Sequence, residues 1–194
     1  MKKTMVACAL LGILTAAACA PRGGGESARP VKLAFVTNNA SEFWKIAAAG
    51  VRKYEAEAKV QVDVKMPANG TPEEQNQILE NLASQGYDAI AVSVVAPNDQ
   101  VPVLNRVAEK AKLITFDSDA PQSNRLLYIG TNNYEAGRAV GKLVKEAMPE
   151  GGVIAIFVGQ LEPLNARQRR QGVLDELADR PPPADINEIE SSGK

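Results

Sequence analysis

The segment AIAVSVV, residues 89–95, decides the fold class of this 194-residue chain. Its run of apolar residues is typical of a parallel β-strand that is buried on both faces. We expect an amphipathic helix before it at 72–85, because Thr71 can cap such a helix and Pro72 suits its first position. The apolar spacing between Val101 and Ala111 predicts a second helix after it.

The same alternation extends in both directions along the chain. Further strands are predicted at 31–36, 60–64, 113–116, 126–129 and 152–158. Further helices are predicted at 41–58, 133–148 and 166–178, the second of them with an apolar stripe at Ala136, Val140, Leu143, Val144 and Ala147. Strands and helices that alternate at this spacing imply an α/β fold with a doubly wound parallel sheet and right-handed crossovers.

The first thirty residues predict export. Lys2 and Lys3 precede an apolar run at 5–14 and then small residues, which is the order of a bacterial secretory signal. That run is much shorter than the roughly 20 residues of a spanning helix. Ala16-Ala17-Ala18-Cys19 resembles a lipoprotein signal, in which Cys19 is lipid-modified and anchors the protein to the membrane, although leucine is usual where Ala16 stands. Ordinary cleavage after Ala18 or Ala20 is the alternative, and we favour the lipoprotein.

Composition excludes several function classes. The 22 basic and 23 acidic residues are scattered without a Lys/Arg-rich block, so no nucleic-acid partner is expected. The chain has no histidine, and both cysteines, Cys8 and Cys19, lie in the signal region. Disulfides, thiolate metal sites, Ser-His triads and Cys-His pairs are therefore excluded from the folded part, and we expect neither metal nor cofactor.

Polar and aromatic residues follow the predicted strands, at the edge where ligands bind in such sheets. They are Thr37, Asn38, Asn39, Ser41, Glu42, Phe43 and Trp44, then Ser93, then Asp117, Ser118 and Asp119, then Asn132, Asn133, Gln160, Glu162, Asn165 and Arg167. Carboxylates, amides and a guanidinium beside rings suit a small polyol, because a buried hydroxyl without a partner costs about 1–3 kcal/mol and C–H faces pack on rings. The sequence therefore predicts a sugar-like ligand.

Four motifs in order make this more specific. They are TNNASEFWK at 37–45, TFDSD at 115–119, GTNNYEAG at 130–137 and ARQRRQG at 166–172. Together they resemble the periplasmic sugar-binding proteins of the ribose/galactose type, over residues 31–177. The resemblance implies the type 1 fold of two lobes joined by a hinge, which closes over a monosaccharide and presents it to a permease of an ABC transporter.

The resemblance also implies roles for single residues. Thr37 and Ser41 would line the first-lobe wall, where the rings of Phe43 and Trp44 would stack on the ligand. Phe43 also lies on the apolar helix stripe and could be core, whereas Trp44 lies off that stripe, so we expect ligand contact rather than burial for it. Ser93 stands where ribose-type receptors use an asparagine.

Further along the chain, Asp117 matches the carboxylate that accepts hydrogen bonds from sugar hydroxyls. The alternative is that Asp117 is a loop residue that only caps the next turn. Ser118 stands where an arginine is common in ribose receptors, which puts ribose in doubt. Arg167 matches the second-lobe arginine that reaches the sugar, and its rigid fork of donors suits that role. Asn132 would lie near the first hinge crossing.

The neighbours of these residues are expected to have other roles. Capping of the next turn is the favoured interpretation for Asp119, and we expect Arg169 and Arg170 to face water.

The domain organisation follows from these assignments. We expect a signal at 1–19, a glycine-rich flexible tether at 20–30, a first lobe at 31–131 and the start of a second lobe at 132–194. Receptors of this type return twice more through the hinge after such a point. We therefore expect the second lobe to be incomplete, as in a truncated product or a partial record, with a natural one-lobe protein as the less favoured alternative.

Two other function classes compete with a transport receptor. The same alternation builds nucleotide-binding enzymes, but residues 37–42 contain no glycine and no Walker-type loop is present, so we expect no enzyme. A carboxylate-dependent hydrolase using Asp117 and Asp119 is the remaining enzymatic alternative. A sensor that hands its closed form to a membrane kinase stays open, whereas the export signal argues against a lac-repressor-like regulator.

Overall fold

The computed structural model describes residues 29–187, so the predicted signal, the site of lipidation at Cys19 and most of the tether lie outside the described residues. Its centre is a parallel sheet of five strands. These are β1 (Lys32–Val36), β2 (Gln61–Lys65), β3 (Ala89–Val92), β4 (Lys112–Phe116) and β5 (Tyr128–Ile129). Their order is β2-β1-β3-β4-β5, so the chain changes direction across the sheet between β1 and β3. The predicted fold class is confirmed.

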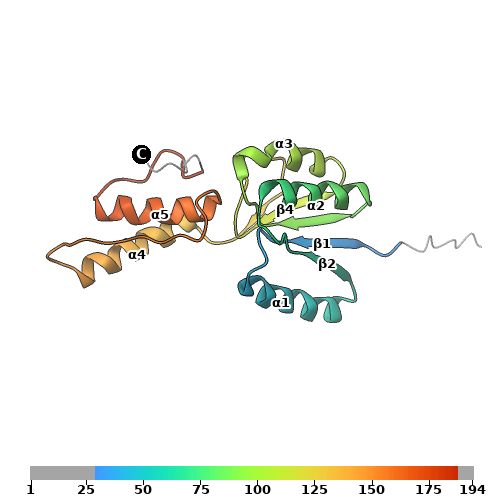
Figure 1. Ribbon diagram of the computed structural model, residues 1–194, viewed down its shortest axis with the longest axis horizontal. Helices are drawn as coiled ribbons and strands as arrows, with labels where there is room; N and C mark the ends of the chain where they lie inside the picture. Colours follow the sequence, from blue (N-terminus) through green and yellow to red (C-terminus); the bar gives the residue numbers. More distant parts are fainter. Residues whose placement is uncertain (1–28, 188–194) are drawn as a thin grey trace, which may run out of the picture.

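Helices cover both faces of this sheet, as Figure 1 shows. Helix α1 (Glu42–Ala58) lies on one face, and α2 (Pro72–Ser84) and α3 (Pro97–Ala108) lie on the other. Alternate strand residues point towards α2 and α3 and form the main core with residues such as Leu79, Ile90 and Leu104, which are fully buried. The sheet is therefore doubly wound, with its apolar core on the α2–α3 side.

The start of α2 is built as the sequence predicts. The side chain of Thr71 accepts a hydrogen bond of 3.3 Å from the backbone N–H of Glu74. The carboxylate of Glu74 in turn accepts from the backbone N–H groups of Ala68 and Asn69, at 2.8 and 2.9 Å. Because these bonds favour the charged carboxylate, they lower the pKa of Glu74.

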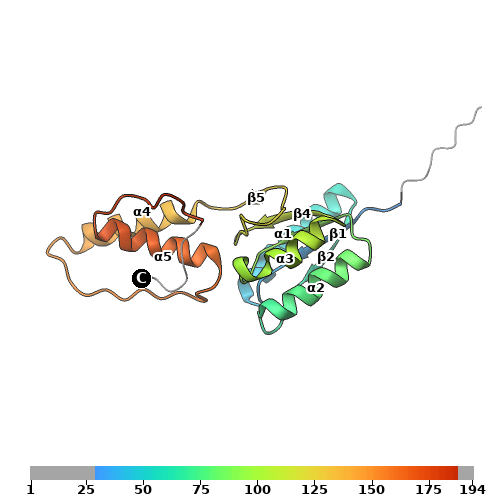
Figure 2. The same ribbon diagram turned by 90° about the horizontal axis from the view of Figure 1, so that it is seen from above.

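Two further helices form a separate pair beyond β5 (Figures 1 and 2). Helices α4 (Asn133–Ala147) and α5 (Leu164–Leu177) lie side by side and approach closely at glycines. A Cβ added at Gly137 would lie 2.1 Å from the carbonyl oxygen of Arg169, and one at Gly172 would lie 2.2 Å from that of Tyr134. Only glycine permits this separation, because any larger residue would meet backbone.

Polar side chains tie this pair together. The hydroxyl of Tyr134 donates to the carboxylate of Asp175 at 3.0 Å, and both residues are buried. Arg138 forms an ion pair of 2.7 Å with Glu176. The carboxylate of Glu176 is thus paired with a cation of α4, whereas that of Asp175 accepts a hydrogen bond from an uncharged hydroxyl.

The predicted strand at 152–158 is wrong for this structure. These residues form no β ladder, and the side chains of Val153 and Phe157 are 98% and 92% exposed. A strand needs a neighbour to satisfy its N–H and C=O groups, and the described residues place no strand beside this segment. For the same reason the predicted apolar stripe of α4 stays largely exposed at Val140 and Leu143.

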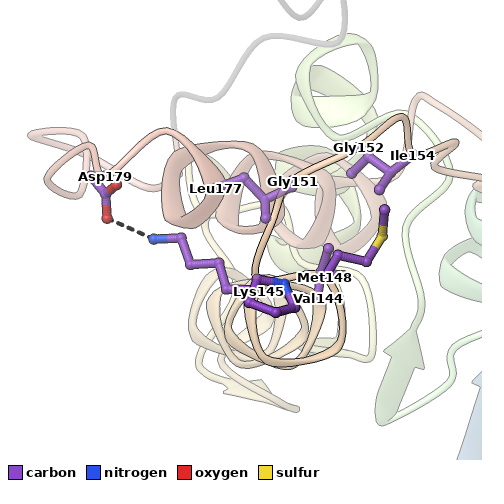
Figure 3. Close-up of a pocket in the computed structure, with 9 residues that line it drawn as sticks. Val144, Lys145, Met148, Gly151, Gly152, Ile154, Leu177 and Asp179 are labelled. Atoms are coloured by element: carbon purple, nitrogen blue, oxygen red, sulfur yellow. Dashed lines mark hydrogen bonds and ion pairs between the residues drawn. The ribbon is translucent and has the colours of Figure 1, made fainter.

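A cavity marks the same region. The cavity has a volume of about 590 Å³. Figure 3 shows Val144, Met148, Ile154 and Leu177, which line it, and the ion pair of Lys145 and Asp179 at one side. The cavity lies where residues 151–154 run past the carboxyl-terminal ends of α4 and α5.

The other predicted elements are present with shifted ends. The strand from Ala89 ends at Val92 instead of Val95, the helix after it begins at Pro97, and the strand predicted from 126 is reduced to Tyr128–Ile129. Ser41 stands at the N-cap of α1, but its side chain makes no capping hydrogen bond. None of the helices within residues 29–187 is long and apolar enough to span a membrane.

Candidate functional site

Three of the predicted site residues meet at the carboxyl edge of the sheet. The strand register pairs Val36 with Val92 and Val92 with Thr115, so Thr37 and Ser93 follow neighbouring strands at the same level. The hydroxyl of Ser93 donates a hydrogen bond of 2.9 Å to Oδ2 of Asp117. The parallel register therefore brings together residues that are distant in sequence.

The backbone around Asp117 holds its carboxylate at this edge. Asp117 adopts a left-handed conformation with φ of 56°, which is uncommon for a residue other than glycine. Its N–H donates to the carbonyl of Ile129 at 3.2 Å, and its carbonyl accepts from the hydroxyl of Tyr128 at 2.9 Å. Burial raises the pKa of that Tyr128 hydroxyl above its ordinary value of 10.0.

The two neighbouring rings of α1 have opposite environments. Trp44 is only 4% exposed; its indole Nε1 donates to Oδ1 of Asn38 at 2.8 Å, and its ring packs against Phe35 and Phe116. Phe43 is 62% exposed and contacts Trp44 edge-on. We expected ligand contact rather than burial for Trp44, and the structure instead buries its ring against the sheet, with the indole N–H bonded to Asn38. For Phe43, the exposed ring contradicts only the alternative that it belongs to the core.

The remaining first-lobe residues lie nearby. Thr37 is fully buried and its hydroxyl donates to the carbonyl of Asn39 at 2.6 Å, whereas Ser41 is exposed. Ser118 is fully buried, and its hydroxyl has no hydrogen-bond partner among the described residues. A buried hydroxyl without a partner is costly, which makes Ser118 a candidate to bind water or ligand.

Asp119 is a structural residue, as expected. Its carboxylate accepts hydrogen bonds from the hydroxyl of Thr115, from the N–H of Ala120 at 2.8 Å and from the guanidinium of Arg125. This pairing raises the pKa of Arg125. Since the carboxylate is fully engaged in holding its own turn, the hydrolase alternative loses one of its two acids.

Asn132 is the residue directly before α4, the helix that follows β5 in the chain. Figure 2 shows how the chain passes from β5 to α4. Its side chain accepts a hydrogen bond of 3.2 Å from the N–H of Glu135 and so caps that helix. Its position agrees with the place expected for the first crossing, and the hinge role stays a prediction.

Arg167 and Arg169, two of the three arginines of α5, differ in their surroundings. Arg167 is 7% exposed, and burial lowers its pKa while the charges of Glu162 and Asp99 oppose that change. Arg169 is exposed, as expected, and it also borders cavities at the carboxyl edge of the sheet, whereas Arg170 is partly buried. Residues two positions apart on a helix point to different sides, and the sequence motif alone did not reveal that Arg169 shares cavities with first-lobe residues such as Asn38 and Asp117.

Two cavities border Arg169 on this side. One of about 450 Å³ is lined by Asn38, Asn39, Gly159, Gln160, Pro163, Asn165, Ala166 and Arg169. The other, of about 520 Å³, places Arg169 with Phe35, Phe116 and Asp117. Both volumes fall in the range of small-molecule sites, about 300–1,000 Å³. Within residues 29–187 no cluster of side chains could hold a metal ion.

Comparison with known proteins finds the same architecture. Residues 33–193 match the family model of the periplasmic binding protein domain. A solute-binding protein of an ABC transporter from Burkholderia graminis, solved with D-arabinose, is 34% identical over 78% of this chain and 53% of its own, with a TM-score of 0.74.

Two further solved structures are similar. A glucose-galactose binding protein from Geobacillus stearothermophilus is 26% identical over 77% of this chain and 54% of its own, with a TM-score of 0.72. A carbohydrate transporter solute-binding protein from Agrobacterium radiobacter, at 24% identity, 78% and 54% coverage and a TM-score of 0.72, supports the fold alone. The chain spans about half the length of these proteins. The family model nevertheless matches most of the chain, and the protein belongs to the periplasmic binding protein domain family.

Proposed function

We propose that this protein is an exported solute receptor that binds a monosaccharide or related small polyol and delivers it to an ABC-type membrane permease. The observation that carries the proposal is the hydrogen bond between Ser93 and Asp117 beside a cavity that Arg169 also lines. A carboxylate held by a hydroxyl, opposite a guanidinium and next to apolar rings, offers acceptors, donors and a stacking surface together. A sugar needs all three.

Two relatives support a sugar as the ligand. The Burkholderia graminis protein was solved with D-arabinose, and the Geobacillus stearothermophilus protein is named for glucose and galactose. Ser118 stands where ribose receptors carry arginine, so a sugar other than ribose is favoured. Its buried hydroxyl is placed to receive a ligand hydroxyl or a bridging water.

The proposed mechanism is reversible capture without chemistry. Residues 31–131 form the first lobe, where Thr37, Ser41 and Phe43 line the wall with Ser93, Asp117 and Ser118. Trp44 supports this wall from behind, since its ring is buried against Phe35 and Phe116. Residues 132–194 belong to the second lobe, which contributes Arg167 as the resemblance implies and Arg169 as the cavities indicate. A ligand that bridges both sides shifts the hinge at Asn132 towards the closed state only by its higher affinity for that state.

The cellular setting is part of the proposal. The signal at 1–19 takes the protein to the periplasm or cell envelope, where a lipid on Cys19 anchors it to the membrane next to its permease. In the alternative, this protein is a ligand-sensing receptor whose closed form binds a membrane kinase instead of a permease. Cross-linking in the native envelope separates the two, because it recovers either a permease or a kinase ectodomain.

Calorimetric titration with a panel of sugars tests ligand binding. We expect the full chain to bind D-arabinose, D-galactose or D-glucose more tightly than D-ribose, without any change in the recovered sugar. Asp117→Ala removes the carboxylate from the site and should abolish binding while the thermal unfolding curve persists. Absence of binding across the panel, or unchanged affinity in Asp117→Ala, contradicts the proposal.

A further inference from the structure

A buried amide lies directly behind the proposed ligand wall. Gln75 belongs to the buried side of α2 together with Leu79, Leu82 and Ala83, where an apolar residue is expected. Its side chain is 0% exposed. A polar group in such a place is costly unless it is fully hydrogen-bonded, so its partners show what it holds.

All four hydrogen-bonding positions of this amide are used. Its nitrogen donates to the carbonyl oxygens of Thr37 and Ser93, both at 2.8 Å. Its oxygen accepts from the backbone N–H of Val95 at 3.2 Å and from the side-chain amide of Gln100 at 3.1 Å. The opposite orientation would face oxygen to two carbonyls and nitrogen to two donors, so only one orientation is compatible with these partners.

The position of the two carbonyls explains the arrangement. Strands β1 and β3 end at Val36 and Val92, so Thr37 and Ser93 are the first residues beyond the ladder. Buried carbonyls at such a point need another donor. Gln75 supplies one donor to each and thereby fixes the separation of the two backbones across the switch point of the sheet.

A second amide holds the first in place. Nε2 of Gln100, which is fully buried on α3, donates to Gln75 and also to Oδ1 of Asn76 at 2.8 Å. Its oxygen accepts from the N–H of Ala96 at 2.8 Å. The amide pair therefore joins α2 and α3 to the ends of β1 and β3.

We infer that Gln75 is a positioning residue of the ligand site, which acts through Thr37 and Ser93 and, through the Ser93 hydroxyl, sets the place of the Asp117 carboxylate. The inference rests on the proposed function, since it concerns the geometry that a ligand would meet. Gln75 itself touches no ligand, because it lies on the core side of the wall.

Three variants on one helix separate positioning from stability. Gln75→Met keeps the length of the side chain and removes its hydrogen bonds. Gln77→Met makes the same change at an exposed position two residues on. Leu79→Ala weakens the core beside Gln75 without touching the wall. All three are measured in the full chain, at a temperature where each is folded.

The dissociation constant of the tightest sugar of the panel is the first readout. We expect Gln75→Met to raise it about tenfold, since a factor of ten corresponds to the loss of one or two buried hydrogen bonds. Gln77→Met and Leu79→Ala should stay within about twofold of the parent protein. A Gln75→Met value no higher than that of Leu79→Ala overturns the inference. If Gln75→Met does not fold, Gln75→Asn, which retains the amide on a shorter stem, is judged by the same criterion.

Backbone hydrogen exchange is the second readout and needs no ligand. The two variants are compared at denaturant concentrations that give them the same free energy of unfolding. Under these conditions the N–H of Val95 should exchange about tenfold faster in Gln75→Met than in Leu79→Ala. If the parent chain binds no sugar, the proposed function fails and the exchange result alone decides the inference. Equal exchange at Val95 in the two variants overturns it.

Discussion

The guanidinium of Arg125 binds both carboxylate oxygens of Asp119 through its Nε and Nη2 groups. Both side chains are mostly buried, so neither charge is well solvated if its partner is removed. Arg125→Met should lower the free energy of unfolding by about 1.5–3 kcal/mol, the usual contribution of hydrogen bonds to a charged group. Urea unfolding measures this value.

Arg106→Met is the matched control for that change. Arg106 pairs with Glu80 at 2.6 Å, but both side chains are about half exposed. Such surface pairs contribute about 0–1 kcal/mol. Equal losses in the two variants would contradict the structural role of the Asp119 turn.

Protonation of Glu74 at acid pH should lower the free energy of unfolding. Hydrogen bonds from the backbone of Asn69 and Ala68 lower the pKa of Glu74 from its ordinary value of 4.5. A carboxyl with a depressed folded pKa stabilises the fold above its unfolded pKa, and this contribution is lost as the pH falls through the folded pKa. The urea midpoint should therefore decline as the pH falls below 4.5.

Glu74→Gln should make that decline shallower, because the variant has no carboxylate to protonate at this position. The exposed Glu73 stands on the same turn, and Glu73→Gln should leave the slope as it is in the parent. The same slope in parent and Glu74→Gln would show that other carboxylates account for acid unfolding.

The close approach of α4 and α5 gives a prediction about alanine. Gly137→Ala places a methyl group 2.1 Å from a backbone carbonyl oxygen and should force the helices apart, at a cost of about 1–3 kcal/mol. Gly50→Ala in α1 meets no atom within 4 Å and should stabilise the protein by about 0.5–1 kcal/mol, because alanine favours helix. Thermal unfolding compares the two, and a shift of the same sign in both would contradict the packing described above.

Trp44 is the single tryptophan of the chain and reports directly on its own burial. Its fluorescence should resist quenching by iodide in the folded protein, because the indole is buried against Phe35 and Phe116. Asn38→Ala removes the acceptor of the indole N–H and should increase quenching. Strong quenching in the parent protein would show that the ring faces solvent.

Much of the sheet body could be predicted from sequence because its signals are local. Apolar runs gave the parallel strands, and Thr71 with Pro72 gave the start of α2 within one residue. The end of the strand from Ala89 could not be predicted, because Val94 and Val95 are also apolar. Their N–H groups leave the ladder for Ser118 and Gln75, which only the tertiary structure supplies.

The site was harder to predict where side-chain direction decides the role. The sequence placed Asp117 and Ser93 at the same edge, and the structure joins them by a hydrogen bond. Trp44 was misjudged because helix periodicity ignores its bond to Asn38. Gln75 was missed because a glutamine in a helix is usually expected to be exposed to solvent. Its position four residues before Leu79 nevertheless puts it on the buried side of α2.

The segment from Val153 to Val158 has a consequence for handling the protein. It contains six consecutive apolar residues with no charge and no proline, and its backbone is unpaired in a ladder. In concentrated solution, such segments of different molecules pair with one another as β-strands. Aggregation should therefore begin through this segment. Phe157→Lys should raise the protein concentration at which precipitation begins.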